Sequence, residues 1–187
     1  MTLLGRLLKN HKADEAYSAW HLPGLQAPEN LTLTSRDFAD GAHMPVRQAA
    51  KNIGGEDVSP HLAWTAPPAG TAQLLLVMED LDIPLMRRPL THCVALIDPS
   101  CGELEPGALD AGRPGAGVRP LRASIGRGYH GPGPIKGHGP HRYVFLLYAL
   151  GVPVGDAAEG ARPKALLSSL TQPPLGRARL TGTYERN

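Results

Sequence analysis

The chain has 187 residues, 42% of them hydrophobic, which is enough for one domain with a buried core. Its net charge is +2 and its basic residues are scattered, which argues against a nucleic-acid partner. No apolar run approaches the length of a membrane span, and the first residues lack the features of a signal peptide. We therefore expect a cytoplasmic protein without integral membrane association.

Glycine and proline are unusually frequent, at 22 and 19 residues. Without strong apolar runs such a composition would indicate disorder, but several such runs are present. The excess therefore predicts many turns between short strands. The two cysteines, Cys93 and Cys101, do not make a secreted disulfide framework and are expected to be reduced thiols.

The first predicted element is a short amphipathic helix. Its apolar face consists of Leu3, Leu4, Leu7 and Leu8, which recur at helical spacing. This helix is expected to dock on the domain or on a partner subunit, with a membrane surface as the less favoured alternative. Residues 13–30 contain prolines and a glycine and are predicted to be an irregular connector. The sequence thus divides into an N-terminal extension, residues 1–30, and one domain, residues 31–187.

Strands are predicted over most of the domain, because apolar runs and alternating patterns are bounded by turn residues. They cover residues 31–35, 59–64, 74–78, 92–97, 143–150 and 179–184. One helix is predicted from Pro163, with Leu166, Leu167 and Leu170 on a single face. Strands dominate and helices lie at the ends, which predicts a mostly β fold: a sandwich of two antiparallel sheets with a few peripheral helices.

Acidic and imidazole side chains lie where three of these strands meet loops. Asp80 directly follows an apolar run, so it should be partly buried and in need of a partner. His92 and His141 each open a strand, and both could reach Asp80. A carboxylate bound to one ring nitrogen would leave the other nitrogen facing a cavity. Two such imidazoles, partly protonated, predict a site for phosphate or carboxylate, to which Tyr143 could add a hydroxyl.

The loop 131–139 is rich in glycine and enters the strand at 143–150. This loop is expected to offer backbone N–H groups to an anion, because glycine lets the backbone come close and turn inward. At least one of the bonds preceding Pro84 and Pro134 is predicted to be cis, since a cis bond fixes a sharp turn.

Several polar residues near this constellation have ordinary structural interpretations. Asp82 is predicted to be an exposed turn former, and Arg142 is expected to pair with an acidic group. His130 and His138 are predicted to be solvated loop residues. None of the spacings resembles a metal-ligand motif, so no metal and no cofactor is expected.

The ordered motifs resemble those of the phosphatidylethanolamine-binding protein family, in its bacterial branch described as Raf-kinase-inhibitor-like. They read Asp80-x-Asp82-x-Pro84, then His92, then Gly131-x-Gly133-Pro134-x-x-Gly137-x-Gly139-x-His141-Arg142-Tyr143. The resemblance extends over roughly residues 31–187. Within it, Leu81 and Ile135 stand where the family usually has proline, which would reshape the rim of a pocket but not its anion-facing residues.

The resemblance implies a fold of two antiparallel sheets with a small pocket for phosphate-like anions. The pocket residues implied are Asp80, His92, His141 and Tyr143, with Gly131 and Gly133 in the glycine loop. Bacterial members of the family are often homodimers, so a homodimer is expected here.

Three functions remain open from the sequence. The first is a non-enzymatic protein that binds a small anion, such as phosphate or a phosphoryl head group. The second is a regulatory protein that inhibits or scaffolds a kinase or another enzyme by recognising a phosphorylated group. The third and least favoured is a hydrolase, because no nucleophile elbow and no metal motif is present and no catalytic residue is identified.

Overall fold

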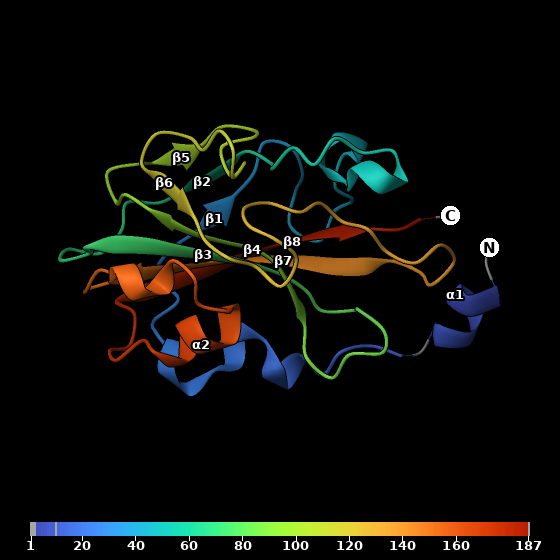
Figure 1. Ribbon diagram of the computed structural model, residues 1–187. Helices are drawn as coiled ribbons and strands as arrows, with labels where there is room; N and C mark the ends of the chain where they lie inside the picture. Colours follow the sequence, from blue (N-terminus) through green and yellow to red (C-terminus); the bar gives the residue numbers. More distant parts are fainter. Residues whose placement is uncertain (1–2, 10, 187) are drawn as a thin grey trace.

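The computed structural model describes residues 3–9 and 11–186 (Figure 1). Its largest element is a five-stranded antiparallel sheet with the order β6-β4-β3-β7-β8. These strands are β6 (Val118–Pro120), β4 (Leu90–Ile97), β3 (Gln73–Asp80), β7 (His141–Leu150) and β8 (Gly176–Tyr184). A smaller antiparallel sheet covers one face, formed by β1 (Leu33–Thr34), β2 (Leu62–Trp64) and β5 (Glu103–Leu104). The predicted mostly β architecture of two antiparallel sheets is confirmed.

Helices are short and peripheral. The α-helices are α1 (Leu3–Leu8) and α2 (Pro163–Ser168), and the latter begins with the proline that the sequence indicated. The 3-10 turns are Glu15–Tyr17, Ala19–His21, Pro23–Leu25, Val46–Gln48, Lys51–Ile53 and Asp156–Ala158. Over residues 3–9 and 11–186, no helix has both the length and the apolar character needed to cross a membrane.

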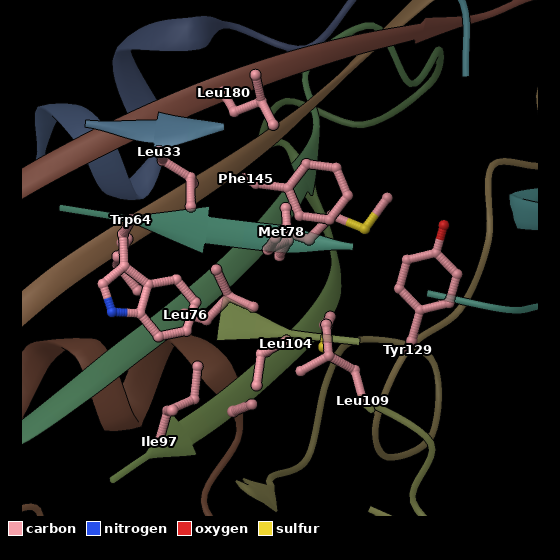
Figure 2. Close-up of a cluster of buried hydrophobic side chains, with 14 of the residues drawn as sticks. Leu33, Trp64, Leu76, Met78, Ile97, Leu104, Leu109, Tyr129, Phe145 and Leu180 are labelled. Atoms are coloured by element: carbon pink, nitrogen blue, oxygen red, sulfur yellow. The ribbon is translucent and has the colours of Figure 1, made fainter. Parts of the chain in front are cut away.

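One hydrophobic core lies between the two sheets. Leu76 and Met78 of β3 face Leu33 and Trp64 of the small sheet, as Figure 2 shows. Phe145 of β7 completes the centre of this cluster and is fully buried. Each large apolar side chain buried in this way contributes about 1.5–3 kcal/mol to stability.

A second core covers the opposite face of the large sheet. There Leu75 and Val77 contact Trp20 and Leu25 of the N-terminal segment and Leu166 of α2. β3 is therefore buried on both faces, which is why its sequence is a continuous apolar run rather than an alternating one. The segment predicted to be an irregular connector instead forms three successive 3-10 turns that pack against the sheet.

The turn after β3 is formed without a cis bond. All described peptide bonds are trans, so the predicted cis bond before Pro84 or Pro134 is wrong. The chain turns instead through an Asx turn, in which the N–H of Asp82 donates to Oδ1 of Asp80 at 2.8 Å. Leu85 then adopts a left-handed conformation, with φ of 64°.

Candidate anion-binding site

A β-bulge in β4 turns His92 toward the end of the sheet where Asp80 and Tyr143 lie. The register between β3 and β4 shifts between Met78 and Glu79, and His92 is the residue left out of the pairing. Asp80 and Tyr143 are direct partners across β3 and β7. The bulge therefore re-aims His92 onto the face that the other two side chains share.

These three side chains line one cavity of about 370 Å³. Its remaining walls are Ala50, Lys51, Asn52, Asp57, Ile83, Leu90, Ile125, His130, Gly131 and Gly133. The volume is in the range of small-molecule sites, and the walls combine apolar surface with a few polar groups, as such sites usually do.

The tautomer of His92 is fixed by a backbone carbonyl group. Its Nδ1 lies 2.9 Å from the carbonyl oxygen of His130, so Nδ1 carries the proton and donates it. Nε2 is buried and has no hydrogen-bond partner among the described residues. Burial lowers the pKa of His92 below its ordinary value of 6.5, although the nearby Asp80 carboxylate opposes this shift. The neutral ring therefore presents an unprotonated nitrogen.

Tyr143 supplies the complementary group. Its ring meets that of His92 edge to face, with centroids 5.3 Å apart. Burial raises the pKa of the Tyr143 hydroxyl well above 10, so this group stays protonated and can donate. The hydroxyl lies near Asp80 and Gly133 but has no partner of normal hydrogen-bond geometry in the described chain. Tyr143 and His92 thus bring a donor and an acceptor to a wall that also contains the unpartnered Nε2 of His130.

Asp80 binds His141 but not His92. Oδ2 of Asp80 lies 2.8 Å from Nδ1 of His141, and Nε2 of His141 lies 2.8 Å from Nδ1 of His138. His141 is completely buried and is not among the residues lining the cavity. The expectation that the second ring nitrogen of His141 faces the cavity is therefore wrong.

His138 is buried, whereas the sequence predicted a solvated loop residue. It is 3% exposed, and its Nε2 contacts the carbonyl oxygens of Leu8 at 2.8 Å and His11 at 3.1 Å. The loop folds back in this way because Gly137 and Gly139 adopt φ values of 81° and 107°, which side chains disfavour. A buried polar chain thus runs from Asp80 to the N-terminal segment.

Asp82 is fully buried, so the prediction of an exposed turn former is also wrong. It accepts from the backbone N–H of Arg142 at 2.8 Å and from its guanidinium at 2.9 and 3.1 Å, and Lys12 approaches to 2.9 Å. Burial alone would raise the pKa of Asp82, but these partners outweigh it and lower the pKa to about 2. Arg142 also pairs with Glu15, which confirms that it binds acidic groups and ties the N-terminal segment to β7.

The two glycines of the motif have different roles. The N–H of Gly131 donates to Oδ1 of Asp57 at 2.8 Å and so is already engaged. A Cβ at Gly131 would lie 2.2 Å from the carbonyl oxygen of Gln48, so this position requires glycine for close packing. Gly133 lines the cavity, whereas Pro84 and Pro134 are buried beside it and are not in its wall.

Some of the wall residues could not be selected from sequence patterns. His130 was expected in solvent, yet its Nε2 is buried without a partner in the described part of the chain. Lys51 adds a positive charge to the cavity wall, and Ile125 adds an apolar side chain. Both residues lie in turn-rich stretches of the sequence that match no motif. Within the described residues, no cluster of three or more His, Cys, Asp or Glu side chains is placed to hold a metal ion.

Comparison with known proteins agrees with this architecture. The sequence model of the phosphatidylethanolamine-binding protein family matches residues 34–185. A UPF0098 protein of Aquifex aeolicus is 31% identical over 186 residues, covering 99% of this chain and 100% of that protein. The UPF0098 protein YbhB of Escherichia coli is 35% identical over 136 residues, covering 70% of this chain and 85% of YbhB.

A solved structure shows the same fold. The crystal structure of Escherichia coli YbcL, described as a new member of the mammalian PEBP family, superposes with a TM-score of 0.75 at 24% identity. The match covers 84% of this chain and 99% of YbcL. The chain therefore belongs to the phosphatidylethanolamine-binding protein family, in the branch of YbhB and YbcL.

Proposed function

We propose that the chain is a non-enzymatic binding protein whose cavity at Asp80, His92 and Tyr143 holds a phosphate-like anion, either phosphate or a phosphoryl head group. The observation that carries this proposal is that two facing residues of the wall, His92 and Tyr143, each hold a buried polar atom without a partner among the described residues, Nε2 and the hydroxyl. Buried polar atoms without partners cost free energy, so a ligand that satisfies both stabilises the protein.

A monoanionic phosphate fits these two atoms. One of its oxygens accepts from the Tyr143 hydroxyl, while its remaining P–OH donates to the bare Nε2 of His92. A phosphate dianion has no proton to donate and needs His92 to be protonated instead. In both cases the complex contains one proton more than the separate phosphate dianion and the protein with a neutral His92 ring. The affinity for phosphate therefore falls as pH rises.

The test is calorimetric titration of inorganic phosphate and phosphoethanolamine over the pH range around 6.5. We expect Tyr143→Phe and His92→Gln each to weaken binding by about tenfold, since each removes one hydrogen bond to a charged group. His43→Gln, on an exposed histidine outside the cavity, is the matched control and should change nothing. Unchanged affinity in Tyr143→Phe, or affinity independent of pH, would contradict the proposal.

The alternative is a regulatory protein in which the same cavity holds a phosphorylated side chain of a partner such as a kinase. It is favoured by exposed apolar side chains near the cavity, Leu85 at 77% and Ile125 at 42% exposure, which a partner could cover. A phosphoserine peptide that binds much more tightly than phosphoethanolamine would support this alternative, and equal affinities would argue against it. The homodimer likewise stays a prediction, for which light scattering is the measurement.

A further inference from the structure

A second cavity lies behind the first, on the opposite face of the large sheet. It has a volume of about 450 Å³ and shares no lining residue with the anion cavity. Its floor is formed by Glu79 of β3 and Thr91 of β4. Leu22 of the N-terminal segment and Leu167 of α2 close its sides.

The rim of this cavity is cationic. Arg88, Arg122, Arg162 and Lys164 all line it and are all exposed. Over the part of the chain that the structure describes, none of the four has an acidic partner within ion-pair distance. Elsewhere on the surface, by contrast, arginines such as Arg119 and Arg127 are paired with carboxylates.

Among the described residues that line this cavity, Glu79 alone carries a carboxylate, and its hydrogen bonds are already satisfied. Glu79 is 4% exposed and accepts from the hydroxyl of Ser18 at 2.6 Å and from the N–H of Ala19 at 3.1 Å. It is therefore held at the floor by its own neutral donors, and the exposed rim sets four cations against this one buried acid. The four cations consequently create a local positive potential over a chain whose net charge is only +2.

Apolar side chains make up about half of the residues that line this cavity. They include Leu22, Met86, Pro89, Pro163 and Leu167, of which Pro89, Pro163 and Leu167 are buried by neighbouring elements. A bare inorganic ion would leave this surface in water, whereas an apolar chain would cover it. The cavity volume is typical of sites for small organic ligands.

We infer that this second cavity binds an organic anion with an apolar body, its acidic head among Arg88, Arg122, Arg162 and Lys164 and its body against Leu22 and Leu167. The ligand class is an amphiphilic monocarboxylate or phosphate monoester. The acidic head stays at the rim because the four cations attract it there and the Glu79 carboxylate at the floor repels it. The site is independent of the function proposed for the first cavity.

The test uses probes that differ only in the head group. Decanoate and decyl phosphate represent the two sources of negative charge, and decanol carries the same chain without charge. We expect both anions to bind the full chain and decanol to bind at least about tenfold more weakly, because it lacks the attraction of the rim. Added salt should weaken the binding of the anions but not that of decanol.

Variants then assign the site. Arg122→Glu combined with Lys164→Glu should weaken decanoate binding by about tenfold or more, while both changes lie on exposed positions and leave folding intact. Arg47→Glu, on an exposed arginine outside both cavities, is the matched control. His92→Gln should leave decanoate binding unchanged, which separates this site from the first cavity.

Three results would overturn the inference. They are failure of both decanoate and decyl phosphate to bind, decanol binding as tightly as the anions, and decanoate binding that survives Arg122→Glu with Lys164→Glu but is lost in His92→Gln. The relative affinities of decanoate and decyl phosphate, measured at one pH, identify which head group the rim prefers.

Discussion

Glu79 and Asp80 are neighbours at the end of β3, yet they serve opposite faces of the sheet in different ways. Asp80 is matched by an imidazole, His141, at 2.8 Å, and lines the cavity of free hydrogen-bonding atoms. Glu79 is matched by neutral donors, Ser18 and Ala19, and lies at the floor of the cation-rimmed cavity. Because successive side chains of a strand point to opposite faces of the sheet, each of the two chemically distinct sites contains one of these carboxylates.

The free-energy cost of burying an ionised carboxylate depends on the group that it binds. Neutral donors compensate a buried carboxylate less than an imidazole does, because an imidazole can share or take up the proton. Burial accordingly raises the pKa of Glu79 to about 6, against the opposing hydrogen bonds from Ser18 and Ala19. Ionisation of Glu79 therefore costs stability, whereas the Asp80 carboxylate is held by the hydrogen bond to Nδ1 of His141.

The largest effect is expected for Asp80→Ala. This change leaves the fully buried His141 without an acceptor, which should lower the free energy of unfolding by about 3 kcal/mol. Urea denaturation measures the loss. Asp156→Ala, at a fully exposed acid, is the control and should have little effect. A similarly small effect for Asp80→Ala would show that the buried pair does not stabilise the protein.

A smaller and opposite effect is expected for Glu79→Gln. The folded protein holds the Glu79 proton up to a pH of about 6, whereas the unfolded chain releases it near 4.5. Between these values the folded state binds more protons, so stability falls as pH rises, by about 2 kcal/mol in total.

In Glu79→Gln this fall should disappear, so the stability of the variant relative to wild type should rise by about 2 kcal/mol as the pH rises from about 4.5 to above 6. Thermal or urea unfolding at several pH values measures it. Parallel pH profiles for the two proteins would refute the assignment of the fall to Glu79. Asp80→Asn is the corresponding replacement of a carboxylate by an amide on the other face of the sheet. It should destabilise the protein, so the two variants compare the two faces directly.

The smallest effect is expected for His138→Ala. His138 joins the Asp80–His141 pair to the carbonyls of Leu8 and His11, so its loss should cost about 1 kcal/mol and loosen residues 3–9 and 11. Amide hydrogen exchange should become faster in that stretch. The amides of residues 18–22, a segment that binds Glu79, should stay protected. Loosening of both stretches together would mean that the N-terminal segment behaves as one unit.

Much of the first site could be predicted from sequence. The apolar run at 74–78 and the polar residues at its end placed Asp80 correctly beside Tyr143, because strand alternation and pairing are short-range regularities. The position of His92 depended on a bulge, and alternation alone would not have aimed it into the cavity. The motif was therefore more informative than the periodicity at this position.

The partners of buried charges could not be predicted in the same way. Arg142 reaches both Asp82 and Glu15, and His138 reaches Leu8, across separations of 60 to 130 residues in the sequence. Asp82 was expected in solvent because its neighbours in sequence are turn residues, yet a distant segment covers it. No local pattern carries that information.

The β-rich fold, its strands and the end of the sheet where a polar site lies all follow from local patterns in the sequence. Turn composition and apolar periodicity are local properties, and they act before any long-range contact forms. Only the tertiary structure decided that His141 points away from the cavity, that Asp82 is buried, and that a second cavity lies behind Glu79. These outcomes depend on how the loop 131–139, α2 and the N-terminal segment pack against the sheet, because burial and pairing are set by segments far apart in the chain.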